Sequence, residues 1–301
     1  MSFHSVLMSP SNIGFWSVPT EIVEQALAFC RPCDVASFAQ TCRAARLLVN
    51  DTTDQYLWRQ LFLLFPFDDP RKTREGFRKD LEFDWKTELQ RRVHAELIAR
   101  NARSTSEDLQ AALVTFLDVV RSALPVLQGC ECVPSSNIRW VTDVLASTNM
   151  LQLPPFTERL TSQTLACFRS HLALTPNDCA DEEEVNSRMP SMRTSSRCRV
   201  YDLSQYNRLS DWGPFVPKTG EVDWSHVECI MNVITFNLMD HSRHFRDARP
   251  PCGLEATRAY SAPHSTTLAP HDWAGVEGNW RRIVSFMDYR CVFSRLRTYR
   301  S

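Results

Sequence analysis

The sequence lacks several features that would assign it quickly to a broad class of protein. No window approaches the ~20 uninterrupted apolar residues of a membrane-spanning helix. The 34 basic and 35 acidic side chains nearly cancel, so no overall electric field attracts nucleic acid or a membrane surface. The opening residues, MSFHSVLMSPSNIG, show no basic start followed by an apolar run, unlike a secretory signal peptide. We therefore expect no nucleic-acid partner and no membrane partner.

Motifs of catalysis and metal binding are also missing. There is no Gly-x-Ser-x-Gly elbow and no phosphate-binding loop, and Gly275-Val-Glu-Gly278 is not a dinucleotide fingerprint. The eleven cysteines form no paired framework, which, without a signal peptide, indicates reduced thiols in the cytoplasm or nucleus. Cys30 and Cys33 have redox-motif spacing but fall between two predicted helices. We expect no catalytic residue, no cofactor and no metal site, and hence a protein that is not an enzyme.

The most informative stretch runs from Phe15 to about Leu61. Pro19 and Glu21 suit the first turn of a helix, Pro32 ends that helix, and Asp34 is a suitable N-cap for a second one. Apolar side chains recur at helical spacing in three segments: Ile22, Val23, Ala26, Leu27 and Cys30; Val35, Phe38, Ala39 and Cys42; Tyr56, Leu57, Trp58, Leu61 and Phe62. Three helices of this size make a small core, so their apolar faces need cover from the rest of the chain or from a partner.

The order of residues in this stretch resembles the F-box domain. The matching pieces are Val18-Pro19, Glu21-Ile22, Arg31-Pro32-Cys33-Asp34-Val35, Thr41-Cys42-Arg43 and Leu57-Trp58-Arg59. The resemblance implies a three-helix module at residues 14–65 that binds an adaptor of the Skp family and, through it, a cullin–RING ubiquitin ligase. By motif position, the implied adaptor contacts are Val18, Pro19, Ile22, Val23, Leu27, Asp34, Val35, Phe38, Leu57 and Trp58.

Four further helices are predicted in a helical region at residues 66–174. The first ends near Asn101, the second begins at Ser106 and the third near Ser136, and the fourth follows Pro155 and reaches Leu172. Together they indicate a helical bundle or stacked hairpins. Ahead of the F-box-like module, residues 1–13 are expected to form a flexible arm.

The character of the chain changes after residue 174. Acidic residues between Asp178 and Glu184, followed by Ser, Met, Pro and Arg, favour a mobile linker at residues 175–197; the alternative is a docking tail for a basic partner. Residues 198–301 are expected to form an α+β region, with a strand over 197–203, a helix capped by Asp223, a long loop over 246–279 and a strand or hairpin over 280–293. The predicted fold class is thus mainly α, with a small α+β part at the C-terminus.

Three segments in and beyond this module resemble a large group of fungal, mushroom-type F-box proteins: DQYLWRQLFLLFPFDDPR, WGPFVP…GEVDWSHVECIM and PHDWAGVEGNWRRIVSFMDYR. In that group the chain usually continues past the FMDYR-like strand, so the resemblance implies an incomplete final domain. The implied function is substrate receptor of an SCF-type ligase, in which the rest of the chain binds a target protein. The alternative is an interaction scaffold that acts outside any ligase.

Four tryptophans lie in the last third of the chain, and Trp is enriched among interface anchors. One interpretation is a target-binding groove; the other is the core of a small sheet-and-helix domain. The candidate groove residues are Trp212, Phe215, Trp273 and Trp280.

Overall fold

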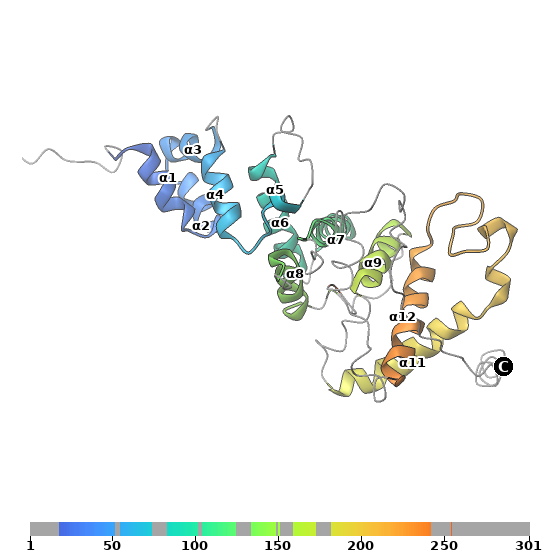
Figure 1. Cartoon of the computed structure of the whole chain (residues 1–301). Helices are drawn as coiled ribbons and strands as arrows, with labels where there is room; N and C mark the ends of the chain where they lie inside the picture. The colour runs from blue at the N-terminus through green and yellow to red at the C-terminus, as the bar shows by residue number, and fades with distance from the viewer. Residues whose placement is uncertain are drawn as a thin grey trace, which may run out of the picture. The chain divides into compact units, whose positions relative to one another are not determined.

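The protein is largely helical. A computed structural model describes residues 18–51, 55–73, 83–101, 104–124, 134–148, 150, 159–172, 182–241 and 254, with the backbone alone for 72–73, 182–190 and 238–241. Within these residues β pairing is limited to one isolated antiparallel bridge between Phe215 and Val222, so the predicted mainly α fold is confirmed (Figure 1). The predicted arm at 1–13, loop at 246–279 and strand or hairpin at 280–293 lie outside the described residues, apart from Leu254 in the loop.

Contacts divide the chain into a first unit, residues 1–67 with 79–93, and a second unit, residues 68–78 with 94–301.

Among the residues that the structure describes, the first unit contains four short helices and the beginning of a longer one. These are α1 (Thr20–Ala28), α2 (Pro32–Ala39), α3 (Arg43–Asn50), α4 (Tyr56–Leu64) and the first half of α6 (Trp85–Arg100). Helix α1 packs on α4, and α2 packs on α3. Fully buried Val35, Ala45, Leu57 and Phe62 form the centre of this core, which fits the predicted need of such small helices for mutual cover.

The predicted second helix is wrong in its bounds, because two helices occupy its place. Helix α2 begins at Pro32 with Arg31 as its N-cap, so Asp34 lies in the first turn and caps nothing. Cys42 then takes an extended backbone conformation, which interrupts the helical hydrogen bonds, and its Sγ accepts a hydrogen bond from the Ala45 N–H at 3.4 Å. Cys42 is therefore the N-cap of α3 rather than the last residue of α2.

The first unit also contains an aromatic cluster that packs around a buried guanidinium. The Phe62 ring lies 5.2 Å from the Phe67 ring and 5.4 Å from the Trp85 ring, measured between centroids. The guanidinium of Arg92 lies 4.8 Å and 4.6 Å from the centroids of Phe62 and Phe67 and pairs with Glu88 at 2.8 Å. Charge pairing and ring contact together offset the cost of burying Arg92.

The second unit contains the remaining helices of the described residues. They are α5 (Pro70–Thr73), the second half of α6, α7 (Ser106–Arg121), α8 (Ser136–Ala146), α9 (Arg159–Leu172), α11 (Glu182–Val200), the 3-10 turns η3 (Leu203–Gln205) and η4 (Arg208–Ser210), and α12 (Trp224–His241). Packing runs in series, from α8 to α7, α9, α12 and α11 (Figure 1). The helices predicted from Ser106, from Ser136 and after Pro155 are confirmed.

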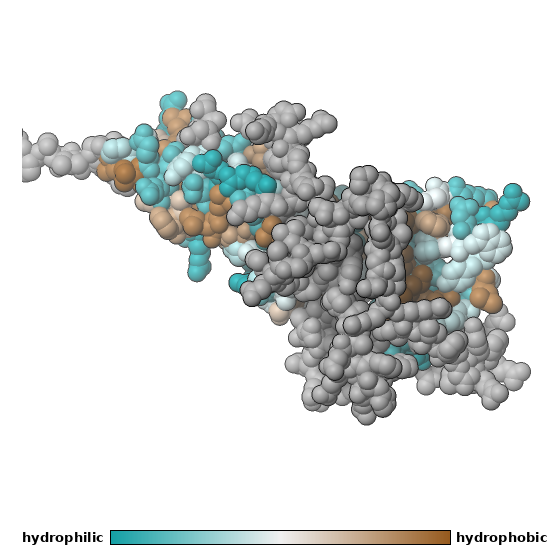
Figure 2. Space-filling model, in the orientation of Figure 1, coloured by the Kyte–Doolittle hydropathy of each residue, from teal (hydrophilic) through white to brown (hydrophobic). Residues whose placement is uncertain are grey.

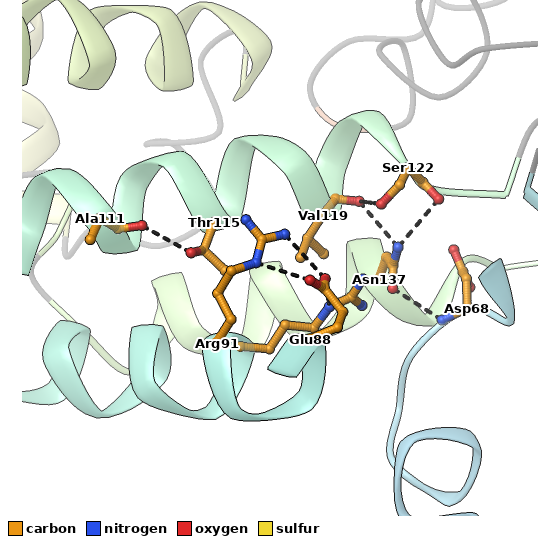
Figure 3. A network of polar contacts seen from close by, with 9 residues as sticks. Asp68, Glu88, Arg91, Ala111, Thr115, Val119, Ser122 and Asn137 are labelled. Carbon is orange, nitrogen blue, oxygen red and sulfur yellow. Dashed lines mark hydrogen bonds and ion pairs between the residues drawn. The ribbon is translucent and has the colours of Figure 1, made fainter. Parts of the chain in front are cut away.

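A buried carboxylate ties the start of the second unit to α7 and α8. Asp68 accepts hydrogen bonds from the backbone N–H groups of Leu124 at 2.9 Å and Ser136 at 2.7 Å, and from the Ser135 hydroxyl. Its own N–H donates to the side-chain oxygen of Asn137 at 3.0 Å, whose amide nitrogen donates to the Val119 carbonyl at 3.1 Å (Figure 3). Each acceptor oxygen of Asp68 is thus satisfied, as burial of a charge requires.

The predictions of a linker at 175–197 and of a strand at 197–203 are wrong where the structure describes these residues. Helix α11 occupies residues 182–200 and packs on α12. Ser196 is buried and accepts a hydrogen bond from Asn232 at 3.2 Å, and the guanidinium of Arg193 lies 5.6 Å from the centroid of the Phe236 ring. Tertiary contacts therefore outweigh a polar composition that alone disfavours a helix.

Candidate protein-binding surface

Helix α1 presents apolar side chains on two of its faces. Val23 and Leu27 point into the first unit and are 6% and 8% exposed. On the other side, Ile22 is 55% exposed and Phe29, two helical turns later at the C-cap of α1, is 77% exposed; Val18, which precedes the helix, is 37% exposed. Among the described residues nothing covers this second face, and large exposed apolar side chains in a row indicate a surface that binds a partner. Figure 2 shows hydrophobic residues reaching the surface among hydrophilic ones over the first unit.

The ten predicted adaptor contacts fall into two groups. Val18, Pro19, Ile22 and Asp34 are exposed and Phe38 is half-buried, so these can touch a partner. The other five are buried in the core of the first unit: Val23, Leu27, Val35, Leu57 and Trp58. Because the second group is buried, its side chains pack in the core and thereby fix the positions of the exposed residues.

Trp58 shows how the buried group acts. Its indole N–H donates to the Val49 carbonyl of α3 at 2.9 Å, and the ammonium of Lys86 lies 5.5 Å from the centre of its ring. The side chain therefore connects α4 with α3 inside the unit, where a buried tryptophan usually finds a partner for its N–H.

A groove opens on the α2–α3 side of the same unit. Its volume is about 950 Å³, and it is lined mainly by α2 and α3, with Trp58 of α4 and Gln90 of α6. Exposed Arg43 and Arg46 lie along it, as does Leu47, which is half exposed. Neither Leu47 nor Phe29, at the C-cap of α1, is among the adaptor contacts predicted from the sequence motif. The spacing of Phe29 from Ile22, two helical turns, is the signal that could have found it.

The predicted target-binding residues lie in a loop of the second unit or outside the described residues. Trp212 is 69% exposed and Phe215 is half-buried, whereas Trp273 and Trp280 are not described. Trp212 and the preceding Asp211 both have positive φ, 59° and 49°, a conformation that costs a non-glycine residue about 1–2 kcal/mol.

Local hydrogen bonds hold this strained loop. The Trp212 N–H donates to the Asn207 carbonyl at 3.0 Å, and the Gly213 N–H donates to the Ser210 carbonyl at 3.0 Å. The buried Ser210 hydroxyl donates to the Gln205 carbonyl at 2.7 Å. Trp212 is thus exposed in a strained conformation that its surroundings maintain, which makes it a candidate binding residue.

The described residues offer little for covalent or metal chemistry. No group of three or more His, Cys, Asp or Glu side chains among them is arranged to hold a metal ion. Cys30 and Cys33 are exposed free thiols. Burial raises the pKa of the Cys167 thiol to about 11, against the opposing charge and hydrogen bond of Arg121, which leaves it a poor nucleophile near neutral pH.

Comparison with known proteins finds a known domain within the first unit. None of the helices in the described part of the chain has the length and apolar character needed to cross a membrane. No curated protein and no solved structure matches the chain. One family model does match: that of the F-box domain, at residues 15–53, which takes in α1, α2 and α3. Residues 15–53 of the chain therefore form an F-box domain.

Proposed function

We propose that the protein is a substrate-receptor subunit of an SCF-type cullin–RING ubiquitin ligase. F-box domains generally bind the Skp adaptor of such ligases, and the match at residues 15–53 places one here. In this role the chain forms no covalent bond itself. It raises the local concentration of a bound target near the charged ubiquitin carrier, and such proximity accelerates transfer without a catalytic residue in the receptor. The cysteines of the described residues are free thiols, which supports a reducing compartment such as the cytoplasm or nucleus.

The observation that carries the proposal is the second apolar face of α1. A helix of nine residues needs one buried face to join its own domain, and Val23 and Leu27 supply it. Val18, Ile22 and Phe29 add an apolar face that the described residues do not use. Burying one such side chain in an interface contributes about 1.5–3 kcal/mol, so this face is suited to a stable adaptor contact.

Target binding is assigned to the second unit, with Trp212 as its anchor. An exposed tryptophan on a rigid loop contributes large contact area at little cost in side-chain entropy. Trp212→Ala should therefore leave the thermal midpoint unchanged and abolish capture of the target. Phe215→Ala is the matched control, since the half-buried ring should cost stability instead. Loss of folding in Trp212→Ala would contradict the assignment.

The adaptor contact is tested with one exposed and one buried neighbour on α1. Ile22→Asp should weaken binding of a purified Skp-family adaptor at least about thirtyfold, or roughly 2 kcal/mol, without changing the thermal midpoint. Thr20→Asp introduces the same charge on the opposite side of α1 and should bind normally. Val23→Asp should unfold the domain. If wild type fails to bind the adaptor, or Ile22→Asp binds equally well, the proposal is wrong.

A second measurement separates a ligase receptor from a scaffold outside any ligase. The reconstituted complex of chain, adaptor, cullin and RING subunit should ubiquitylate a captured target, and Ile22→Asp should abolish this. Adaptor binding without any such transfer would favour the scaffold.

A further inference from the structure

Primary amines are rare in this chain. Of its 34 basic residues, 30 are arginine and four are lysine, namely Lys72, Lys79, Lys86 and Lys218. Lysine is ordinarily among the commonest residues of a protein, and its amine is the group to which ubiquitin is attached. Arginine therefore supplies most of the positive charge of this chain without offering an acceptor. Between residues 87 and 301 the one lysine is Lys218.

Lys218 lies at the tip of a tight turn in the loop that carries Trp212. The Thr219 N–H donates to the Val216 carbonyl at 3.2 Å, and Lys218 has a positive φ of 67°. With Pro217 before it, this is the geometry of a type II turn, whose third residue is usually glycine. A lysine at this position is held against its backbone preference, so the turn itself does not account for the residue type.

The amine of Lys218 is exposed, and its side chain makes no hydrogen bond or ion pair with any described residue. The backbone N–H of Lys218 donates to the Leu209 carbonyl at 2.9 Å, which fixes the turn and leaves the side chain outside. Lys86 differs, because it is half-buried and its Nζ lies 3.4 Å from the Asn50 carbonyl oxygen and 5.5 Å from the centre of the Trp58 ring. These contacts compete with an acyl donor for the amine of Lys86 and have no counterpart at Lys218.

We propose that Lys218 is a ubiquitin-acceptor site of the receptor itself. The inference rests on the proposed function, which brings a ubiquitin thioester on its carrier to the complex that contains this chain. The neutral amine of Lys218 attacks the thioester carbonyl. A C–N bond forms as the C–S bond breaks, the carrier cysteine leaves as a thiolate, and the amine proton passes to that sulfur or to water. The chain is the acceptor in this step and supplies no catalytic group.

The test is a reconstituted ubiquitylation reaction to which no target is added. Full-length chain, adaptor, cullin and RING subunit are combined with activating enzyme, carrier and ubiquitin, and mass spectrometry locates the conjugated residues. Wild type should carry ubiquitin on Lys218. Lys218→Arg keeps the positive charge but has no primary amine, so it should lose most of the total conjugate. Lys86→Arg is the matched control and should be modified as fully as wild type.

A second measurement checks the exposed amine without any ligase. A limiting amount of an acetylating N-hydroxysuccinimide ester should modify Lys218 faster than Lys86 in the folded chain. The difference should disappear in urea, where the contacts of Lys86 are lost. Equal rates in the folded chain would overturn the inference, because the Lys218 amine would then have no advantage as an acceptor.

The outcomes separate this inference from the proposed function. Discharge of the carrier to free lysine shows that the assembled ligase is active. If that active ligase leaves the chain unmodified, or modifies Lys218→Arg as fully as wild type, the acceptor site is overturned and the receptor role stays in place. Conjugates confined to Lys72, Lys79 or Lys86 have the same meaning. Failure of wild type to bind the adaptor overturns both.

Discussion

The side-chain oxygen of Gln55 accepts a hydrogen bond from the backbone N–H of Trp85 at 2.8 Å, thirty residues later in the chain. The same oxygen lies 3.4 Å from the Lys86 N–H. Gln55 itself has a positive φ of 41° and precedes α4. One side chain thus satisfies free donors at the start of α6, which a helix leaves without partners of its own.

Replacing Gln55 should loosen the start of α6. In Gln55→Ala the Trp85 and Lys86 N–H groups lose their acceptor, at a cost of about 1–2 kcal/mol, and their hydrogen exchange should accelerate. Gln55→Asn is the control for backbone strain, because Asn tolerates a positive φ but its shorter side chain cannot keep the same bond. Protection as in wild type in Gln55→Asn would show that the hydrogen bond contributes little.

Asp68 provides a contrast between two neighbouring carboxylates. Asp68→Asn replaces one acceptor oxygen with an NH₂ group that faces a donor, so it should lower the free energy of unfolding of the second unit by about 2–4 kcal/mol. Asp69 pairs with Arg71, which is half exposed, so Asp69→Asn should cost less than about 1 kcal/mol. Urea denaturation followed by circular dichroism measures both. Equal costs would contradict the role given to the Asp68 network.

Local signals in the sequence were enough to predict the helices that begin with a strong cap. The helix predicted from Ser106 exists because Thr105 and Asp108 form a capping box immediately before and within its first turn. The division between α2 and α3 depends on a cysteine cap at Cys42, which is not among the preferred capping residues. Helix α11 was not predictable, since its support comes from α12, which lies far along the sequence.

The sequence predicted the position of the candidate site on α1 but not which of its residues are exposed. Family resemblance located α1, but periodicity cannot tell which of two apolar faces is buried when residues such as Ile22 and Val23 are adjacent. The packing of α1 on α4 decides this. The α2–α3 groove requires the spatial approach of two helices, so no spacing in the sequence could have shown it.

The stability of the second unit should depend on the protonation of His226. Burial lowers the pKa of His226 below its ordinary value, and the charge of Arg199 lowers it further against the opposing charge of Asp223. The folded side chain, whose Nε2 lies 3.0 Å from the Tyr206 hydroxyl, therefore resists a proton that the unfolded chain accepts. Because the folded pKa is depressed, the contribution is present above about pH 6.5 and is lost as pH falls towards the folded value.

Urea denaturation at pH 7.5 and pH 5.5 tests this dependence. Wild type should lose more stability between the two values than His226→Gln, which keeps a donor for Tyr206 but cannot titrate. Parallel losses in the two proteins would mean that other groups account for the pH dependence.

The loop that carries Trp212 should depend on close packing between a glycine and an aromatic ring. A Cβ atom added at Gly213 would lie 2.7 Å from a carbon of the Phe215 ring, so Gly213→Ala must displace that ring at about 1–3 kcal/mol. Gly220 has a φ of 73° and open space around it, so Gly220→Ala should cost about 1–2 kcal/mol from backbone strain alone. Because the two substitutions have similar expected costs, their causes are distinguished by a double-mutant cycle with Phe215→Ala, measured as free energies of unfolding. Because Phe215→Ala removes the clash, it should cancel most of the Gly213→Ala cost and leave the Gly220→Ala cost unchanged; additive costs at Gly213 would show that the ring does not set the loop.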